Sequence, residues 1–551
     1  ILPLLAAILK EDFITDTVMV FDVYQTLGFT SERWFIVFLC VVILLFVAAK
    51  NLFGLWIQKT QIKFSLDASE TLSDRVLISA YKKGYLFFSN ENSNNLSNRI
   101  IGVPSRFAQL LVIQLFQFLN ELVVLLLVIV SLLFYDYKIL LLLGAVVLPV
   151  FYMFYQYSKL RVSYYQKRLN ELEPQISKPI FEVVFGFVDV VIGGVFPSFR
   201  SQYLRGVKER KELNVLNLVV QQIPNRLVEI CVILAVIIML LYGVFVLEKP
   251  SQIITLLSVF ALAAYRSIPS INRLMLALVN VKGQEYMFPL LESFLPFTTM
   301  DYNQKQFDFK DKIQLKNLSF QFPETKSLVV DTFNLEIKKG EVIGLVGKSG
   351  SGKTTLMNML LGFLKPTNGA IMIDGEELNE SNLTSWQKKI GYVRQDVFII
   401  DGTVAENIAF GIIEEAIDYN KLTQSIEKAQ LTEVVQQLGG VHSTIGERGS
   451  KISGGQRQRV GIARTLLHDP EVLIFDEPAN GLDPEARIEM RDLLLRLADL
   501  GKTLIVTSHI LPELARICDQ IGIISAGKLR AFGTMNEINK HLMNYLECFL
   551  S

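Results

Sequence analysis

A glycine-rich loop of the form GxxxxGK[ST] is the clearest chemical motif in this chain. It reads GKSGSGKT and follows an apolar, strand-like run at 342–346. Glycines let backbone N–H groups surround phosphate oxygens, and a helix that follows the loop directs its positive end at them. Lys353 would place a cation near the β- and γ-phosphates, and the Thr354 hydroxyl would bind Mg²⁺. The residues assigned to phosphate binding are Gly347, Ser349, Gly350, Gly352, Lys353, Thr354 and Thr355.

An acidic pair ends a later apolar run, Leu473-Ile474-Phe475-Asp476-Glu477. A carboxylate at the end of a buried strand can hold Mg²⁺ directly or through water, which is the role assigned to Asp476. Glu477 is the candidate general base that polarises an attacking water. The alternative is that the pair only caps the next helix.

A second anion-binding end precedes a predicted helix at 458–467. It consists of Ser453, Gly454, Gly455 and Gln456, and a serine with two glycines at a helix start presents free N–H groups. Since the glycine-rich loop already binds the phosphates of its own domain, this end is predicted to serve another nucleotide.

In this order, the loop, the SGGQ segment and the acidic strand end resemble the nucleotide-binding domain of the ABC transporter family. The resemblance implies ATP hydrolysis with Mg²⁺ and a signature segment that reaches the ATP of a partner domain. One such domain per chain therefore favours a homodimer with two shared sites. The resemblance also assigns Gln395 to the Q-loop that touches Mg²⁺, His509 to the γ-phosphate switch, Phe322 to the adenine ring and Asp483 to the D-loop. For Phe322, a position in the hydrophobic core remains the alternative.

The first half of the chain is typical of a membrane protein. Apolar residues make up 51% of the sequence, and runs at 34–57, 107–134, 139–155, 227–246 and 253–281 approach or exceed the roughly 20 residues of a membrane-spanning helix. The apolar run 1–9 is interpreted as the outer end of a truncated first span, which makes six. Long basic segments follow the second and fourth spans, whereas the opposite connections are short, so the long segments are predicted to be cytosolic.

These patterns define a fold class and its boundaries. We expect an α-helical transmembrane domain at 1–297 with long cytosolic helical hairpins, a linker at 298–312, and a cytosolic α/β P-loop ATPase domain at 313–551 with a helical subdomain at about 397–468. Breaks in these cytosolic helices are predicted near 92–95 and at Gly193 and Gly194, and a further buried strand is predicted at 504–507. The resemblance implies that the hairpin tips dock on nucleotide-binding domains. The four cysteines have no paired spacing, so neither a metal site nor a disulfide framework is indicated.

Three segments bear on the branch of the family. The segments 444–449 and 397–408 resemble those of exporters, and 261–273 resembles the sixth helix of lipid-linked-oligosaccharide flippases. After Glu477 the sequence instead resembles stand-alone ABC ATPases, which leaves the finer subfamily, and a recombinant origin, open.

Charged residues in the apolar part suggest a substrate cavity. Arg266 and Arg273 are two helical turns apart and share a face, and Arg266 lies about 20 Å along its span. A charge at that depth is expensive unless it faces water or a partner. The pair is interpreted either as a cationic site for a phosphate-bearing headgroup or as a snorkelling Arg273 with an internally paired Arg266. Glu121, on a polar face with Gln114, is a candidate partner for Arg266.

The sequence thus predicts an ATP-driven exporter or flippase in a bacterial inner membrane that moves an amphipathic lipid outward. A lipid-linked oligosaccharide or another lipid with an anionic headgroup is the first substrate class. An exporter of peptides, drugs or other lipids is the alternative, and an ATP-gated regulator without transport is a different class of function. The formal net charge of zero gives no support for a nucleic-acid partner.

Overall fold

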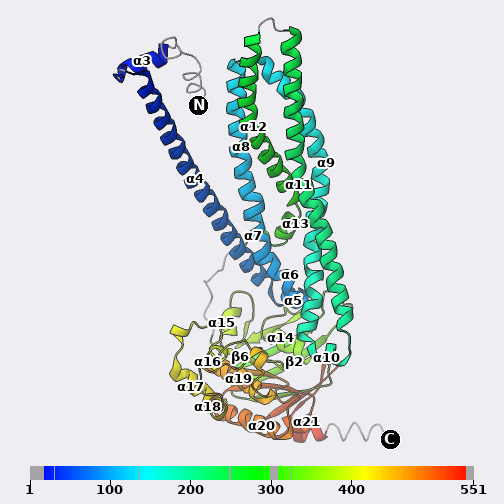
Figure 1. The fold of residues 1–551 in the computed structure, drawn as a ribbon. Coiled ribbons are helices and arrows are strands. Elements are labelled where there is room, and N and C mark those ends of the chain that lie inside the picture. Colours follow the sequence, from blue (N-terminus) through cyan, green and yellow to red (C-terminus); the bar gives the residue numbers. More distant parts are fainter. Residues whose placement is uncertain are drawn as a thin grey trace. The chain divides into compact units, whose positions relative to one another are not determined.

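The computed structural model describes residues 18–29, 31–135, 137–246, 250–297, 308–323 and 325–540 (Figure 1). The predicted end of a first span at 1–9 and most of the predicted linker fall outside these residues. The chain divides into two compact units. Unit 1 comprises Ile1–Lys83 and Asn90–Thr299, and unit 2 comprises Gly84–Ser89 and Met300–Ser551.

The described part of unit 1 is helical. Its elements are α3 (Val18–Thr26), α4 (Glu32–Lys82), α6 (Ser93–Ser97), η1 (Asn98–Gly102), α7 (Val103–Phe107), η2 (Ala108–Val112), α8 (Ile113–Tyr135), α9 (Tyr137–Phe185), α10 (Phe187–Ile192), α11 (Phe196–Val246), α12 (Pro250–Gly283) and α13 (Met287–Glu292). The helices α4 and α11 have 51 residues each. At 1.5 Å per residue such a helix is about 75 Å long, whereas the hydrocarbon core of a bilayer is about 30 Å thick. These helices therefore continue well beyond a membrane, as the long basic segments predict.

Three stretches of the described residues are long and apolar enough to cross a membrane: Arg33–Lys82, Ser93–Val130 and Phe196–Ile238. Their apolar side chains are mostly exposed, with Leu44 at 67% and Phe46 at 71%. Exposed side chains of this kind suit contact with lipid. The prediction of a helical membrane part with more than one span is confirmed, while the count of six remains a prediction.

The helices α9 and α11 run antiparallel and lie side by side over much of their length (Figure 1). A small buried cluster joins α9, α11 and α12 through Phe154, Val162, Val220, Met275 and Val279. The helix break predicted at 92–95 lies where Asn92 caps α6, with its side chain accepting a hydrogen bond from the backbone N–H of Asn94. The break predicted at Gly193 and Gly194 separates α10 from α11.

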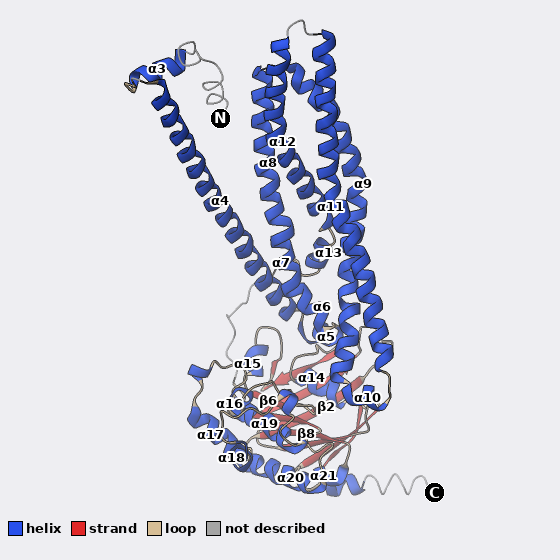
Figure 2. Cartoon of the chain, viewed as in Figure 1, coloured by secondary structure: helices blue, strands red, loops and turns tan. Residues whose placement is uncertain are grey.

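Unit 2 contains two β-sheets, and it holds all strands of the described residues (Figure 2). The first sheet has the order β2-β1-β4-β5 and is antiparallel, and the second has the order β10-β9-β3-β8-β7-β6. In the second sheet β9, β3, β8, β7 and β6 are parallel, and β10 is antiparallel to β9. The strands are β1 (Lys312–Phe320), β2 (Val330–Lys338), β3 (Val342–Val346), β4 (Asn368–Ile373), β5 (Glu376–Glu377), β6 (Ile390–Val393), β7 (Val472–Asp476), β8 (Thr503–Ser508), β9 (Gln520–Ser525) and β10 (Lys528–Gly533).

The helical segments of unit 2 alternate with its strands or follow one another between them. They are α14 (Lys353–Leu360), α15 (Leu383–Gln387), α16 (Val404–Ile408), η3 (Glu414–Ala416), α17 (Tyr419–Lys428), α18 (Thr432–Leu438), η4 (Glu447–Gly449), α19 (Gly454–Leu466), α20 (Pro484–Asp499) and α21 (Leu511–Leu514). Between β6 and β7 the chain forms only helices and loops, so the helical subdomain has the predicted composition. The helix predicted at 458–467 starts four residues earlier, at Gly454, because Ser453 caps it.

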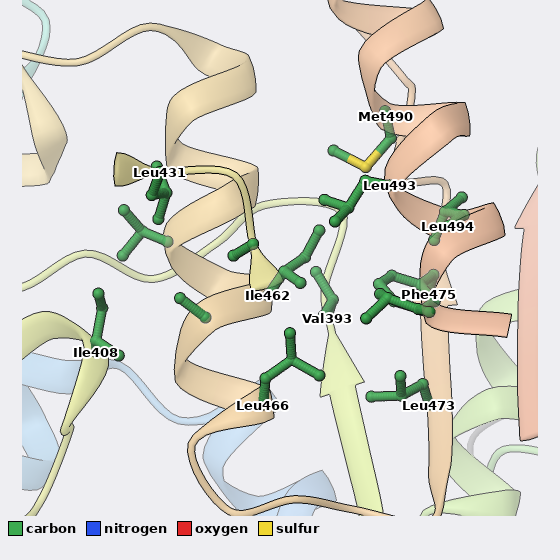
Figure 3. Packing of buried hydrophobic residues seen from close by; sticks show 14 of the residues in the cluster. Val393, Ile408, Leu431, Ile462, Leu466, Leu473, Phe475, Met490, Leu493 and Leu494 are labelled. Carbon is green, nitrogen blue, oxygen red and sulfur yellow. The ribbon is translucent and has the colours of Figure 1, made fainter. Parts of the chain in front are cut away.

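The core of unit 2 joins this helical subdomain to the parallel sheet (Figure 3). Ile462 and Leu466 of α19 face Val393 of β6 and Phe475 of β7, and all four are buried. Strands that are covered on both faces read as continuous apolar runs, which is why β3, β7 and β8 were recognisable in the sequence.

The short helix α5 (Gly84–Asn90) contributes Gly84–Ser89 to unit 2. The Tyr85 ring stacks on Phe363 with ring centroids 5.5 Å apart, and its hydroxyl lies 3.5 Å from Nδ2 of Asn358. Leu86 packs on the core cluster of the first sheet. These residues belong to the tip of the first predicted cytosolic hairpin.

Candidate functional site

The glycine-rich loop connects β3 to α14 at the carboxyl end of the parallel sheet, where α/β proteins bind ligands. Gly352 has a φ of 101°, and a Cβ at this position would meet the carbonyl oxygen of Val329 at 2.8 Å. Glycine is therefore required there by both the backbone conformation and the space. Residues of the loop and of the start of α14 line a cavity of about 620 Å³, namely Lys348, Ser349, Gly350, Gly352, Lys353, Thr354 and Thr355. Gln395, Glu477 and His509 line the same cavity.

Lys353 lines this cavity, and its side chain is only 5% exposed. Its Nζ donates a hydrogen bond to the carbonyl oxygen of Gly347 over 2.7 Å and lies 3.2 Å from Oε1 of Glu477. A buried ammonium group needs an anion nearby, and Glu477 is that anion here. Because Lys353 also lines the cavity, its ammonium group can bind a phosphate oxygen there as well.

Asp476 ends β7 and is 4% exposed. Its Oδ2 accepts a hydrogen bond from the hydroxyl of Thr354 over 3.1 Å, and its Oδ1 accepts one from the hydroxyl of Thr507 over 2.7 Å. The Thr507 hydroxyl also accepts a hydrogen bond from the backbone N–H of Glu477 over 2.9 Å. Thr507 thus orients both acidic residues, and sequence reasoning missed it, although it stands two residues before His509 on a predicted strand.

A hydroxyl and a carboxylate side by side are the oxygen ligands that Mg²⁺ prefers, and Mg²⁺ binds through few protein groups together with phosphate oxygens and water. Thr354 and Asp476 fit this requirement, and Gln395 lines the same cavity. The described residues contain no cluster of three or more His, Cys, Asp or Glu that would hold a metal by themselves.

Glu477 has a positive φ of 50°, which is uncommon for a residue with a side chain. This conformation follows the end of β7 and places its carboxylate among three polar groups. Oε1 faces Lys353, whereas Oε2 lies 3.2 Å from Nδ1 of His509 and accepts a hydrogen bond from Nδ2 of Asn480 over 3.2 Å. A carboxylate that points into the cavity beside a histidine can accept a proton from an attacking water.

Tyr392 of β6 adds no charge to this site. Burial and the nearby negative charge of Asp476 raise the pKa of the Tyr392 hydroxyl well above its ordinary range. The phenol is therefore neutral at physiological pH.

The signature residues lie apart from this cavity. Ser453 caps α19: its hydroxyl accepts a hydrogen bond from the backbone N–H of Gln456, and the Gln456 side chain accepts one from the backbone N–H of Ser453. Gly454 lines a second cavity of about 220 Å³ with Gln395 and Asn480. The structure thus brings Lys353, Thr354, Asp476, Glu477, Gln395 and His509 together, whereas the signature end of α19 does not line their cavity.

Two further residues that were assigned to the nucleotide, Phe322 and Asp483, contact neighbouring residues of their own segments. Phe322 packs edge-on against Phe320, with ring centroids 5.0 Å apart, and is partly buried against the core. Asp483 caps α20, where its Oδ2 lies 3.3 Å from the backbone N–H of Ala486. Neither residue lines the cavity at the glycine-rich loop, so their assignment to ATP stays a prediction.

In unit 1, Glu121 and Arg273 meet. Nε of Arg273 on α12 donates a hydrogen bond to Oε1 of Glu121 on α8 over 2.5 Å, and the Glu121 side chain is 6% exposed whereas that of Arg273 is 47% exposed. Seven residues away on each of the same two helices, Nδ2 of Asn280 lies 3.4 Å from Oε1 of Gln114. The polar face of α8 therefore packs against α12, and Glu121 has Arg273 as a partner. The side chain of Arg266 lies outside the described residues.

Comparisons with known proteins agree with this geometry. Residues 330–480 match the family model described as ABC transporter. The chain is similar to an ATP-dependent lipid A-core flippase of Ralstonia nicotianae, at 34% identity over 47% of this chain and 43% of the relative. It is also similar to a sophorolipid transporter of Starmerella bombicola, at 34% identity over 41% of this chain and 18% of the relative. The matched region thus covers less than half of the length of each of these two relatives.

Among solved structures, the chain resembles a bacterial Atm1-family ABC exporter with ATP bound. The TM-score is 0.78 at 21% sequence identity, and the match covers 96% of this chain and 92% of the other. This likeness extends over both units, so it concerns the helical part as well as the domain with the glycine-rich loop.

Proposed function

Because this chain belongs to the ABC transporter family and has the fold of an exporter-type half-transporter, we propose that it hydrolyses ATP to move an amphipathic lipid outward across a membrane. The convergence of Lys353, Thr354 and Glu477 on one cavity of about 620 Å³, with Asp476 hydrogen-bonded to Thr354, is the observation that carries this proposal. It is a multi-pass protein of the bacterial inner membrane, with the ATPase domain in the cytosol.

The residues divide the work of hydrolysis. The loop amides and Lys353 bind the phosphates and stabilise the charge that develops on them. Thr354 and Asp476, with Gln395, would hold Mg²⁺, which would supply positive charge beside the phosphates. Glu477 accepts a proton from the attacking water. His509 lines the same cavity and lies within hydrogen-bond distance of the Glu477 carboxylate.

The partner is a second copy of the chain. The signature end of α19 does not line the nucleotide cavity of its own domain, which supports a role at the nucleotide of another domain. The short helix α10 also exposes apolar side chains, with Val191 at 59% and Ile192 at 81%. It lies in a predicted cytosolic extension, where exposed apolar side chains favour a protein partner.

The substrate is an amphiphile with an anionic headgroup, such as a lipid-linked oligosaccharide or lipid A-core. Arg273 supports this choice, because Glu121 engages its Nε while nearly half of its side chain remains exposed. A guanidinium group has five N–H donors, so the remaining donors can bind a phosphate oxygen. The names of the relatives, a lipid A-core flippase and a sophorolipid transporter, are consistent with a lipid cargo.

The test uses the full chain in proteoliposomes. Stimulation of ATP hydrolysis and outward movement are measured with a lipid-linked oligosaccharide, lipid A-core and a peptide. We expect Glu477→Gln to remove turnover while ATP still binds, and Arg273→Gln to weaken stimulation by the anionic lipids. The control is Arg226→Gln, because Arg226 pairs with Glu229 on an exposed face of α11. Full turnover in Glu477→Gln contradicts the assigned base, and stimulation by the peptide alone favours the alternative export function.

A further inference from the structure

One face of the signature helix α19 holds the segment that contains Gln395. The contacts come from residues 458, 461 and 464, which are three apart and therefore share that face. Nε2 of Gln458 donates hydrogen bonds to the carbonyl oxygens of Gln395 over 2.6 Å and of Arg394 over 3.4 Å. One turn later, a Cβ at Gly461 would meet Cγ2 of Val397 at 2.8 Å, so the helix and the segment are already in close contact there.

The third contact extends this hold. Nε of Arg464 donates a hydrogen bond to the carbonyl oxygen of Asn407 over 2.8 Å, and a terminal nitrogen donates one to the carbonyl oxygen of Phe398 over 2.8 Å. Burial lowers the pKa of the Arg464 guanidinium, but a guanidinium remains charged at physiological pH. Charge-assisted bonds to two carbonyl oxygens make this a strong attachment. The segment from Arg394 to Phe398 is therefore joined to α19 at three successive points.

Gln458 has features that simple packing does not require. Its side chain is 5% exposed, its two amide hydrogens serve two backbone carbonyls, and its Oε1 is buried without a hydrogen-bond partner among the described residues. An unpaired buried acceptor is destabilising, and a methionine or leucine would fill the same volume without it. The amide is thus better explained by its hold on the backbone of Gln395 than by its contribution to the core.

The place of Gln395 gives this hold a consequence. Gln395 lines both the cavity of about 620 Å³ at the glycine-rich loop and the cavity of about 220 Å³ beside the start of α19. Gln458 lies one turn inside α19, whose first residue, Gly454, lines the second cavity as well. A shift of the signature end of α19 must therefore displace the backbone of Gln395 and move its side chain relative to the nucleotide.

We propose that Gln458 is a positioning residue: it couples the placement of Gln395 in the nucleotide cavity to the position of the signature helix. This inference rests on the proposed function, since it assigns Gln395 to the ATP site. In a dimer that closes on ATP, contact at Ser453 and Gly454 would thus align Gln395 through Gln458. The coupling lies within one chain and needs no contact between Gln458 and the nucleotide.

The experiment measures ATP hydrolysis by the full chain in proteoliposomes. Gln458→Met keeps the length of the side chain and removes both donors. We expect kcat to fall about tenfold, which corresponds to about 1.4 kcal/mol, the scale of one lost hydrogen bond, and KM for ATP to stay within about twofold. Gln437→Met is the matched control, because Gln437 is an exposed glutamine on α18, and we expect it to leave kcat unchanged.

A double-variant cycle separates positioning from packing. If Gln458 acts through Gln395, adding Gln458→Met to Gln395→Ala will lower kcat little beyond Gln395→Ala alone. Losses that multiply overturn the proposal, as does an unchanged kcat in Gln458→Met. If Gln458→Met does not fold, Gln458→Asn retains an amide that is one methylene too short to reach both carbonyls, and the same cycle is run with it. If the wild-type protein hydrolyses ATP but the losses in kcat of the two variants multiply, only this inference is wrong. If the wild-type protein does not hydrolyse ATP, both the proposed function and this inference are wrong.

Discussion

Thr507→Val tests whether one hydroxyl holds the acidic residues of the ATP site in place. Thr507 is fully buried, donates to Oδ1 of Asp476 over 2.7 Å and accepts from the backbone N–H of Glu477 over 2.9 Å. Valine has nearly the same shape but no hydroxyl, so both partners lose their hydrogen bond and remain in place. The change therefore isolates the polar contribution of this residue.

The expected cost follows from these two bonds. A hydrogen bond to a charged group contributes about 1.5–3 kcal/mol, and a buried N–H left without a partner costs about 1–3 kcal/mol. Because both effects arise from one hydroxyl, they are not fully additive, and we expect the ATPase domain to lose about 3 kcal/mol of stability. For a domain of this size, that loss lowers the melting temperature by about 6–12 °C. The kcat should fall as well, because Asp476 and Glu477 both lose an orienting contact.

The assay combines thermal unfolding of the full chain with ATP hydrolysis. Thr507→Ser is the control, since it keeps the hydroxyl and removes only a methyl group, at a cost of about 1 kcal/mol. We expect Thr507→Ser to retain most of the activity and most of the melting temperature. If Thr507→Val and Thr507→Ser melt and hydrolyse ATP alike, the hydroxyl does not orient the acidic residues and the reasoning is wrong.

Two further predictions concern charge and backbone conformation. Burial raises the pKa of Glu471, but hydrogen bonds from Lys339 and Lys389 outweigh it, so the pKa is lowered overall. The ionised carboxylate therefore stabilises the fold above the unfolded pKa, and this stabilisation is lost as the pH falls through the folded pKa. Glu471→Gln should therefore lower stability by about 0.5–1 kcal/mol at pH 7, after allowance for solvent screening. The difference between the two proteins should shrink as the pH falls below the ordinary glutamate pKa of about 4.3, and a constant difference contradicts the ion-pair assignment. Gly352→Ala should weaken ATP binding at least about tenfold, because its Cβ would meet the Val329 carbonyl at a positive φ. Gly350→Ala, which also has a positive φ but open space around the Cβ, should weaken it less; equal dissociation constants in a fluorescent-nucleotide titration would show that the close contact is irrelevant.

Much of the fold could be predicted from local patterns. Long apolar runs identified the membrane part, and the buried strands β3, β7 and β8 read as continuous apolar segments next to recognisable motifs. The motifs also located Lys353 where the glycine-rich loop enters α14, and Asp476 and Glu477 at the end of β7. Each of these features depends on residues that are close in the sequence, so no knowledge of the folded chain was needed.

Contacts between distant segments were harder to anticipate. Glu121 was considered as a partner for Arg266, whereas the described contact joins it to Arg273, because α8 and α12 run antiparallel in a register that a single sequence does not contain. Asn480 and Thr507 were missed for a related reason. An asparagine in a loop and a threonine in a strand carry no distinctive signal until the fold brings them to Glu477.

The sequence by itself determined the class of chemistry and the order of the parts. A glycine-rich loop, an acidic strand end and a signature segment specify phosphate binding because their function resides in local backbone geometry and residue type. Only the tertiary structure decided which groups share a cavity and which are kept apart. It placed Gln395 and Glu477 in one cavity with Lys353, and the start of α19 in a neighbouring cavity, because the packing of the helical subdomain on the parallel sheet sets those positions.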